Sequence, residues 1–227
     1  MTYEKTKVII PASGMGIRLG ADVPKQFLML GGVHILKRTI SIFQEMDEID
    51  EIAVAVPPGY TETIQAYGLD KVCYIVEGGD SRAASVHSAL NMLPANTDIV
   101  LIHDGVRPFA TPRLVRSVIE AVKKYGAAVP GVPVTDTIKQ TDSAGKITST
   151  PDRTNLWRAQ TPQGFTYDII KAAYRQAEKG GFNATDDSEL VERMGVPVRV
   201  VPSEAGNIKI TTAEDLAVAS IWLGRQM

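Results

Sequence analysis

The 227-residue chain is 44% hydrophobic and 22% charged, a composition typical of a domain with one substantial buried core. Lys and Arg total 24 against 26 for Asp and Glu, which excludes the strong positive field that gathers nucleic acid non-specifically, and the few apolar residues before Pro11 are too short for a signal sequence or a spanning helix. We therefore expect a cytoplasmic protein of one domain that acts on small molecules, with neither nucleic acid nor membrane as a partner.

Short β-branched runs alternate with segments of helical periodicity, which predicts βαβ units, an α/β fold and a mostly parallel central sheet. The runs that we expect to be strands are 8–10, 52–56, 72–76, 99–102 and 128–134. Apolar side chains recur at helical spacing in 86–93 and 114–122. Thr111 and Pro112 suit the start of the second of these helices, and 212–215 resembles a capping box for a last helix.

A different kind of element is predicted in the second half of the chain. The segments 137–141 and 146–150 flank the turn-forming residues 142–145, which indicates a β-hairpin arm within 137–158 of the single domain 1–227. An arm with alternating Thr, Ile and Lys needs a surface to lie on. We expect that surface on a second subunit, in a homodimer, with a hairpin folded back on its own chain as the alternative.

Side chains that bind metals or react as nucleophiles are few and scattered. Cys73 is the only cysteine, and its place in the apolar run 72–76 predicts an inert thiol inside the core. The three histidines, His34, His87 and His103, show no metal-ligand spacing, and we interpret them as structural. No Ser-His-Asp spacing is apparent either, which argues against hydrolysis through a covalent intermediate.

A glycine-rich turn follows the first predicted strand, and such turns let backbone N–H groups approach phosphate oxygens. Its candidate contact residues are Ala12, Ser13, Gly14 and Gly16. The dinucleotide-binding motif fails because Leu19 stands where it needs a glycine, and the P-loop motif fails because Gly-Lys-Ser/Thr is absent. Arg18 and Lys25 add two cations that suit a triphosphate, with a tight turn carrying two solvated cations as the alternative.

A second glycine site lies between the third predicted strand and the helix that follows it. Gly79 permits close backbone approach, with Asp80 beside it, and Ser85 or the helix N-terminus could meet a base or a ribose. An ordinary β-to-α turn with a capping side chain explains the pattern equally well, so both interpretations stay open.

Charged residues follow the fourth predicted strand, at the edge where open α/β sheets bind ligands. Asp104, next to Gly105, could hold a metal or a hydroxyl, and Arg107 could bind phosphate or brace Asp104. A structural Asp–Arg pair is the alternative. Hydroxyls and cations later in the chain suit a polyol phosphate; they are Thr137, Arg153, Thr161, Thr185 and Lys209.

The order of these motifs resembles the 2-C-methyl-D-erythritol 4-phosphate cytidylyltransferases of the non-mevalonate isoprenoid pathway, over about residues 7–216. The matching segments are 14–18, 24–27, 78–82, 103–108, 136–139, 152–153, 160–163 and 207–211. Their joint order makes chance a poor explanation. The resemblance implies a Rossmann-like three-layer nucleotidyltransferase with a projecting β-arm, which transfers CMP from CTP to the erythritol phosphate and releases pyrophosphate.

The resemblance also implies roles for the cations. Arg18 and Lys25 would stabilise the charge that develops on the CTP α-phosphate in the transition state, and Arg153 and Lys209 would position the acceptor phosphate. A magnesium ion is implied on the triphosphate. So is a homodimer, whose arm carries Arg153 into the neighbouring site.

The remaining candidates divide between the two substrates. The resemblance implies that the cytosine and ribose lie near Gly79, Asp80 and Ser85. It implies an acceptor pocket lined by Asp104, Arg107, Thr137, Thr161 and Thr185.

The motif after the fourth predicted strand departs from the family pattern. Gly105-Val106 stands where the family more often has two alanines, and is closer to the Ser-Val of the ribitol 5-phosphate cytidylyltransferases. Segments 151–157 and 187–192 follow the erythritol branch, which we favour. A nucleotide-binding protein without turnover is the alternative of another class, and the intact set of four cations argues against it. The failed glycine spacing argues against an NAD-dependent oxidoreductase.

Overall fold

The structure is a computed structural model that describes residues 4–15, 23–182 and 184–226. Within these residues eight strands form one sheet, in the order β10-β7-β11-β6-β1-β4-β5, with β12 paired to β7. Most neighbouring pairs are parallel, and β10 and β11 run antiparallel to the strands beside them. The strands are β1 (Thr6–Pro11), β4 (Glu51–Val56), β5 (Val72–Glu77), β6 (Ile99–Ile102), β7 (Ala127–Pro133), β10 (Trp157–Ala159), β11 (Gln163–Thr166) and β12 (Arg199–Pro202).

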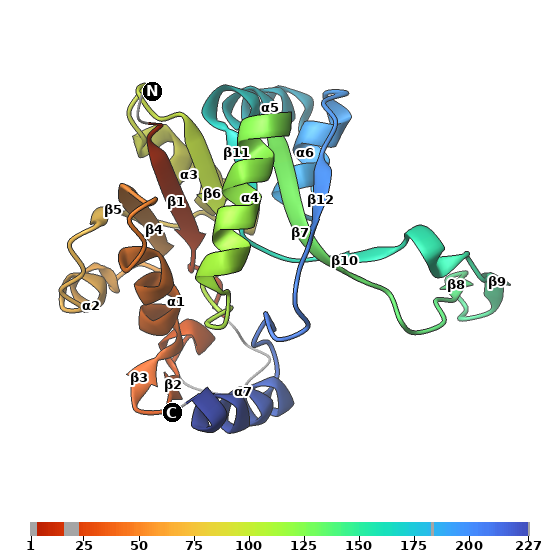
Figure 1. The fold of residues 1–227 in the computed structure, drawn as a ribbon, viewed down its shortest axis with the longest axis horizontal. Helices are drawn as coiled ribbons and strands as arrows, with labels where there is room; N and C mark the ends of the chain where they lie inside the picture. The colour runs from red at the N-terminus through yellow and green to blue at the C-terminus, as the bar shows by residue number, and fades with distance from the viewer. Residues whose placement is uncertain (1–3, 16–22, 183, 227) are drawn as a thin grey trace.

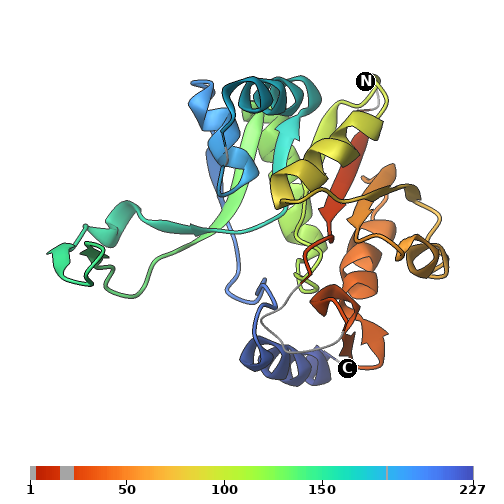
Figure 2. The same cartoon turned by 180° about the vertical axis from the view of Figure 1, so that it is seen from behind.

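Helices cover both faces of this sheet and give the expected three layers (Figures 1 and 2). The α-helices are α1 (Ile35–Gln44), α2 (Thr61–Gln65), α3 (Arg82–Met92), α4 (Pro112–Tyr125), α5 (Tyr167–Gly180), α6 (Asp187–Arg193) and α7 (Ala213–Gln226). Successive side chains of β1 point to opposite faces of the sheet. Val8 and Ile10 pack in the core cluster with α1 and α4, and Ile9 packs in the cluster with α3, α5 and α6. None of the described helices is long and apolar enough to cross a membrane.

The five predicted strands are present, and the predicted helix starts are confirmed by their caps. Thr111 Oγ1 accepts a hydrogen bond from Leu114 N at 3.2 Å, and α4 begins at Pro112. At the start of α7, Asp215 N donates to Thr212 Oγ1 at 3.2 Å and Thr212 N donates to Asp215 Oδ2 at 2.9 Å. Aspartate therefore completes a reciprocal capping box in the position where glutamate is commoner.

The prediction that Cys73 is buried in the core is wrong. β5 is the last strand of the sheet on its side, and Cys73 is exposed on it. An apolar run shows that a segment is a strand, but the order of strands in the sheet decides which of them lies at the edge.

The segment between β7 and β10 projects from the body of the molecule (Figure 1). A backbone hydrogen bond from Val134 N to Leu156 O, 2.9 Å long, closes its base. The predicted hairpin is present near its tip as β8 (Gln140–Thr141) paired with β9 (Ile147–Ser149), and a 3-10 turn, η3 (Arg153–Asn155), lies on the return. We call residues 134–156 the arm. Both hairpin strands are shorter than the expected 137–141 and 146–150. The turn between them is held by Asp142, whose Oδ1 accepts from Ala144 N and Lys146 N.

Candidate functional site

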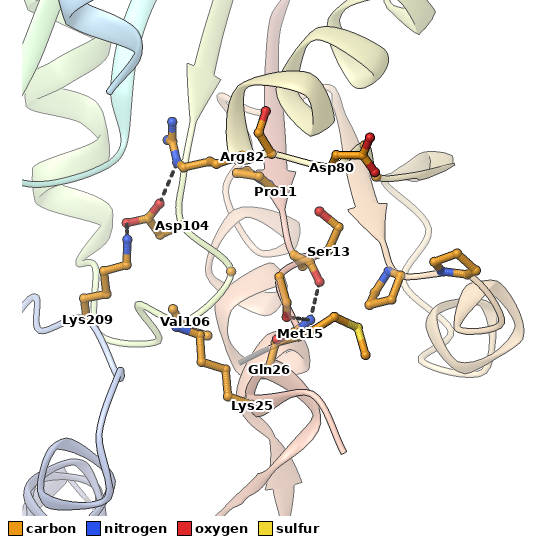
Figure 3. A pocket seen from close by; sticks show the side chains of 18 residues that line it. Pro11, Ser13, Met15, Lys25, Gln26, Asp80, Arg82, Asp104, Val106 and Lys209 are labelled. Carbon is orange, nitrogen blue, oxygen red and sulfur yellow. Dashed lines mark hydrogen bonds and ion pairs between the residues drawn. The ribbon is translucent and has the colours of Figure 1, made fainter. Parts of the chain in front are cut away.

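A cavity of about 500 Å³ opens beyond the carboxyl ends of β1, β4, β5 and β6 (Figure 3). This is the edge at which open α/β sheets bind ligands. The cavity brings together nine of the residues predicted for the site, which are Ala12, Ser13, Gly14, Lys25, Gly79, Asp80, Asp104, Gly105 and Lys209. The motifs quoted from distant parts of the sequence therefore meet at one place.

Asp104 is the centre of a charged cluster in the cavity wall. Its Oδ1 accepts from Arg82 Nε at 3.2 Å, and its Oδ2 accepts from Arg107 Nε at 3.2 Å and from Lys209 Nζ at 3.0 Å. Burial by itself would raise the pKa of Asp104, but the charges of Lys209, Arg82 and Arg107 outweigh it and hold that pKa well below its usual range. The carboxylate thus stays ionised and fully paired, and Arg107 acts as its brace.

The loop that carries Lys209 is tied to the end of β6. Arg107 Nη1 donates to the carbonyl of Asn207 at 2.7 Å, and Asn207 Nδ2 donates to the carbonyl of Thr161 at 2.8 Å. Because both bonds are buried, they fix the backbone two residues before Lys209. Asn207 was not singled out from the sequence, since its partners lie 46 and 100 positions away.

Thr161 supports the cavity from behind. It is buried, its Oγ1 accepts from Asp104 N at 3.1 Å, and it lies 3.1 Å from Nδ1 of the buried His103. His103 Nε2 faces the carbonyl of Arg107 at 3.1 Å, so Nε2 carries the proton and the Thr161 hydroxyl donates to Nδ1. Burial lowers the pKa of His103 to about 4, which keeps the ring neutral. Thr161, expected to contact the acceptor, positions the Asp104 backbone in this structure.

Arg82 was missed as a site residue. It begins α3 and lines the cavity, and besides Asp104 it contacts Asp187 at the start of α6, with 2.7 Å between Nη2 and Oδ2. Asp187 is only 1% exposed, and its Oδ1 accepts from Tyr174 of α5 at 2.6 Å. Burial opposes the charge on Arg82, but Asp187 and Asp104 raise its pKa far above the usual range. The Gly-Gly-Asp-Ser-Arg pattern marked the turn, but no local signal joins positions 82 and 187.

Gln26 holds the glycine-rich turn after β1. Its buried side-chain amide Nε2 donates to the carbonyl of Gly14 at 3.1 Å and to that of Ala12. Gln26 belongs to the Pro-Lys-Gln-Phe motif seen in the sequence. Its role in fixing the turn could not be predicted, because it depends on these contacts with Ala12 and Gly14.

Ser13 and Ser85 meet between the two glycine sites. Their Oγ atoms are 2.6 Å apart, and Ser85 is 0% exposed while Ser13 lines the cavity. Ser85, expected to contact the nucleotide, is therefore covered by Ser13. A Cβ at Gly78 would stand 2.1 Å from Ser13 Cβ, so this contact requires glycine at position 78.

Comparison with known proteins decides the family. The model of the 2-C-methyl-D-erythritol 4-phosphate cytidylyltransferase family, IspD, matches residues 6–225. The chain belongs to this family.

Curated relatives align with this chain along almost its whole length. An enzyme of Syntrophus aciditrophicus named for the same activity is 41% identical over 98% of this chain and 97% of its own length. One of Alkaliphilus oremlandii is 44% identical over 95% of this chain and 93% of its own length.

Solved structures agree as well. The 4-diphosphocytidyl-2C-methyl-D-erythritol synthase of Anaerococcus prevotii superposes with a TM-score of 0.86 at 33% identity, over 98% of this chain and 99% of that chain. The 2-C-methyl-D-erythritol 4-phosphate cytidylyltransferase of Thermus thermophilus superposes with a TM-score of 0.81 at 37% identity, over 96% of this chain and 98% of that chain. The resemblance found in the sequence is confirmed, as is the α/β fold with its mostly parallel sheet.

Not all residues implied by the family reach the cavity of this chain. Arg153 lies exposed on the arm, where its Nη1 donates to the carbonyl of Thr135, and Thr137 is also exposed on the arm. Thr185 lies before α6, where its hydroxyl donates to Glu189 Oε2 at 2.9 Å. Arg18 and Gly16 lie outside the described residues.

The cavity charges suit an anionic ligand of the family. Lys25, Arg82 and Lys209 line the cavity together with Asp80 and Asp104, which gives three positive charges against two negative ones among the described lining residues. Over the same described part of the chain, no three His, Cys, Asp or Glu side chains gather to hold a metal. Asp104 is also committed to three cations, which makes it a poor metal ligand. Asp80 is the lining carboxylate outside this cluster, and its oxygens are of the kind that magnesium prefers.

Proposed function

We propose that the protein transfers CMP from CTP to 2-C-methyl-D-erythritol 4-phosphate, forming 4-diphosphocytidyl-2-C-methyl-D-erythritol and pyrophosphate. The observation that carries this proposal is the cation-lined cavity at the carboxyl edge of the sheet, built from the family's motifs. Charged substrates of this kind belong to the cytoplasm, where we place the reaction.

The reaction brings two negatively charged phosphate groups together, so the site must reduce the repulsion between them. An oxygen of the acceptor phosphate attacks the α-phosphorus in line, a P–O bond forms, and the bond to pyrophosphate breaks. A phosphate monoester is already largely ionised at neutral pH, so no general base is required. Lys25, together with Arg18, is assigned to the α-phosphate, where fixed cations in a partly dehydrated cavity stabilise developing negative charge.

Lys209 is assigned to the acceptor phosphate. Its side chain is 39% exposed although it touches Asp104, so its ammonium group has access to a ligand. Arg82 and Arg107 keep Asp104 paired on both oxygens, which leaves Lys209 able to share its charge with an incoming phosphate. Asp104 in turn keeps the ammonium aimed at the cavity.

Magnesium would reduce the negative charge of the triphosphate when bound with it. Asp80, the lining carboxylate outside the Asp104 cluster, would help to hold the ion beside the phosphates.

We also propose a homodimer in which the arm brings Arg153 to the site of the neighbouring subunit. Arg153 and Thr137 are exposed on a segment that projects from its own body (Figure 1). The arm exposes the apolar side chains of Ile138 and Ile147, and Trp157 at its base is 40% exposed. Apolar groups on a projecting hairpin favour contact with another surface.

Two alternatives are less well supported. The full-length relatives carry the name of the erythritol phosphate enzyme, which disfavours ribitol phosphate as the acceptor despite Gly105-Val106. A nucleotide-binding protein without turnover would have no need of Lys25 and Lys209 in one cavity.

The test is a product assay that crosses four nucleoside triphosphates with erythritol-type and ribitol-type phosphates. We expect the highest kcat/KM for CTP with 2-C-methyl-D-erythritol 4-phosphate, measured by pyrophosphate release and the mass of the product. Lys25→Met should lower kcat by about a hundredfold or more, because losing one preorganised transition-state contact costs about 2.7–4 kcal/mol.

Lys179→Met is the matched control, since Lys179 is exposed on α5 outside the cavity, and it should keep wild-type kcat. Faster turnover of ribitol 5-phosphate would refute the acceptor assignment. Absence of any nucleotide transfer would refute the activity itself.

A further inference from the structure

An aromatic stack connects two parts of the cavity wall. The ring of Phe27 lies on the ring of Tyr60, with 4.2 Å between the ring centroids and 17° between the planes. Phe27 comes two residues after Lys25, and Tyr60 comes two residues after Pro58, and both Lys25 and Pro58 line the cavity. The stack therefore joins the segment of Lys25 to the loop that follows β4.

The segment of Lys25 is one tight turn, the 3-10 helix η2 (Lys25–Phe27). Phe27 N donates to the carbonyl of Pro24 at 2.9 Å, and Leu28 N donates to that of Lys25 at 3.1 Å. Between them, Gln26 is bonded to the glycine-rich turn and lies beside Lys25 (Figure 3). Because the turn is closed by its own hydrogen bonds, a displacement of Phe27 moves the backbone of Lys25 with it.

The ring of Phe27, which is 6% exposed, is held from a second side as well. The ring of His34, in the two-residue strand β3 (Val33–His34), meets it edge-on, with centroids 6.0 Å apart and 88° between the planes. His34 Nδ1 lies 2.8 Å from the hydroxyl oxygen of Tyr67. Tyr60 precedes α2 and Tyr67 follows it, so this short helix supports the face contact and the edge contact together.

From this geometry we infer that Tyr60 is a positioning residue for Lys25, an inference that rests on the proposed function. Its ring holds Phe27, and the turn carries that position to the ammonium group assigned to the α-phosphate. A misplacement of about 1 Å at the reacting atoms can cost on the order of a hundredfold in rate. Tyr60 itself never needs to touch a substrate.

Replacing the ring should change the rate and leave binding nearly intact. Tyr60→Leu keeps an apolar side chain but removes the stack, so kcat should fall about tenfold while the KM values for CTP and the acceptor stay within about twofold. The reason is that Lys25 acts on charge that develops in the transition state, more than on the bound ground state. Tyr60→Phe keeps the stack and should retain at least about half of the wild-type kcat.

A double-mutant cycle with Lys25→Met is the decisive measurement. When Tyr60→Leu is added to Lys25→Met, the residual kcat should not fall further, because the group that Tyr60 positions is already gone. Tyr60 also packs against the core cluster of α1 and α4, and a general effect of that packing on the site would lower kcat by the same factor in both backgrounds. The slow residual turnover is measured by product mass over long incubations.

Tyr125→Leu is the matched control, because it makes the same change at a tyrosine that is 42% exposed at the end of α4, and it should keep the wild-type kcat. Thermal melting of every variant sets an assay temperature at which all of them are folded. If Tyr60→Leu melts too early for the assay, Tyr60→Met takes its place in the cycle, since it also removes the ring.

The outcomes separate this inference from the proposed function. Equal losses in the two backgrounds would overturn it, as would a Tyr60→Leu protein with unchanged kcat or with a change in KM alone. A Tyr60→Phe protein as slow as Tyr60→Leu would assign the effect to the hydroxyl and overturn the role of the stack. Wild-type protein without any nucleotide transfer would instead contradict the proposed function.

Discussion

An aspartate stabilises the wall of the cavity and another stabilises the tip of the arm, but the two differ in burial and in how far along the chain their partners lie. Asp187 behind the cavity is 1% exposed and is held by Arg82 and Tyr174, which come from two other helices. Asp142 at the arm tip is exposed and is held only by the backbone of Ala144 and Lys146, two and four residues away. Contacts between residues far apart in the sequence tie the cavity wall to the core, whereas the turn at the arm tip is held by contacts between neighbouring residues.

The largest expected effect tests this contrast directly. Asp187→Ala should lower the free energy of unfolding by about 3–5 kcal/mol, because it leaves Arg82 short of a partner and the buried Tyr174 hydroxyl unpaired. Asp142→Ala should lower it by only about 0.5–1 kcal/mol, because the exposed turn loses two hydrogen bonds to backbone N–H groups but no buried group is left unpaired. Urea unfolding of both variants measures the difference. Equal losses would mean that the arm is as tightly coupled to the core as the cavity is.

A second prediction is that the protein loses stability in acid, and that this loss comes from the buried His103 behind the cavity. The pKa of His103 is lowered to about 4 in the folded protein and is about 6.5 in an unfolded chain, so between these values the unfolded chain binds the extra proton. The stability from neutral His103 is complete above pH 6.5 and is lost as the pH falls toward 4. The loss should be about 3 kcal/mol, since one pKa unit corresponds to about 1.4 kcal/mol.

Unfolding free energies measured from pH 7 to pH 4 check this. His103→Gln should be less stable at pH 7 but should lack most of the slope, because it has no imidazole to protonate. A variant with the wild-type slope would show that another group is responsible.

The third prediction is that, in the proposed dimer, Lys25 acts in the site of its own subunit and Arg153 acts in the site of the other. Lys25→Met and Arg153→Ala should each be inactive, but when they are co-refolded in equal amounts about half of the dimers are mixed. Each mixed dimer then has one site with both residues and one with neither. Activity should recover to about a quarter of wild type. No recovery, with mixed dimers demonstrated by native mass spectrometry, would show that Arg153 serves its own subunit.

Local patterns predicted much of the fold, because strands, caps and turns depend on neighbouring residues. Thr111 and Pro112 fixed the start of α4, and the turn at Asp142 was visible in the sequence. The side of the sheet on which Cys73 lies could not be predicted, since strand order depends on the whole topology. This is why the thiol was wrongly placed in the core.

The sequence motifs predicted residues that line the cavity. They did not predict the buried contacts that hold those residues in place. Asp104 and Lys209 lie together as expected, but Arg82 and Asp187 meet across 105 positions with no periodic signal to join them. Ser85 was expected to contact the nucleotide, but its fully buried position depends on how closely β5 and α3 pack. Packing of this kind is decided by the tertiary fold.

The exposed position of Cys73 gives the molecule a single attachment point for a reporter group. The chain has one cysteine, so a thiol-reactive dye would label each copy of the chain once, on the edge strand and outside the cavity lining. Partial burial of the sulfur and the charge of Glu51 raise the pKa of this thiol, so conjugation should go faster in mildly alkaline buffer. With donor and acceptor dyes on separate batches, energy transfer after mixing would test the proposed dimer and follow exchange between its subunits, without altering a side chain of the cavity.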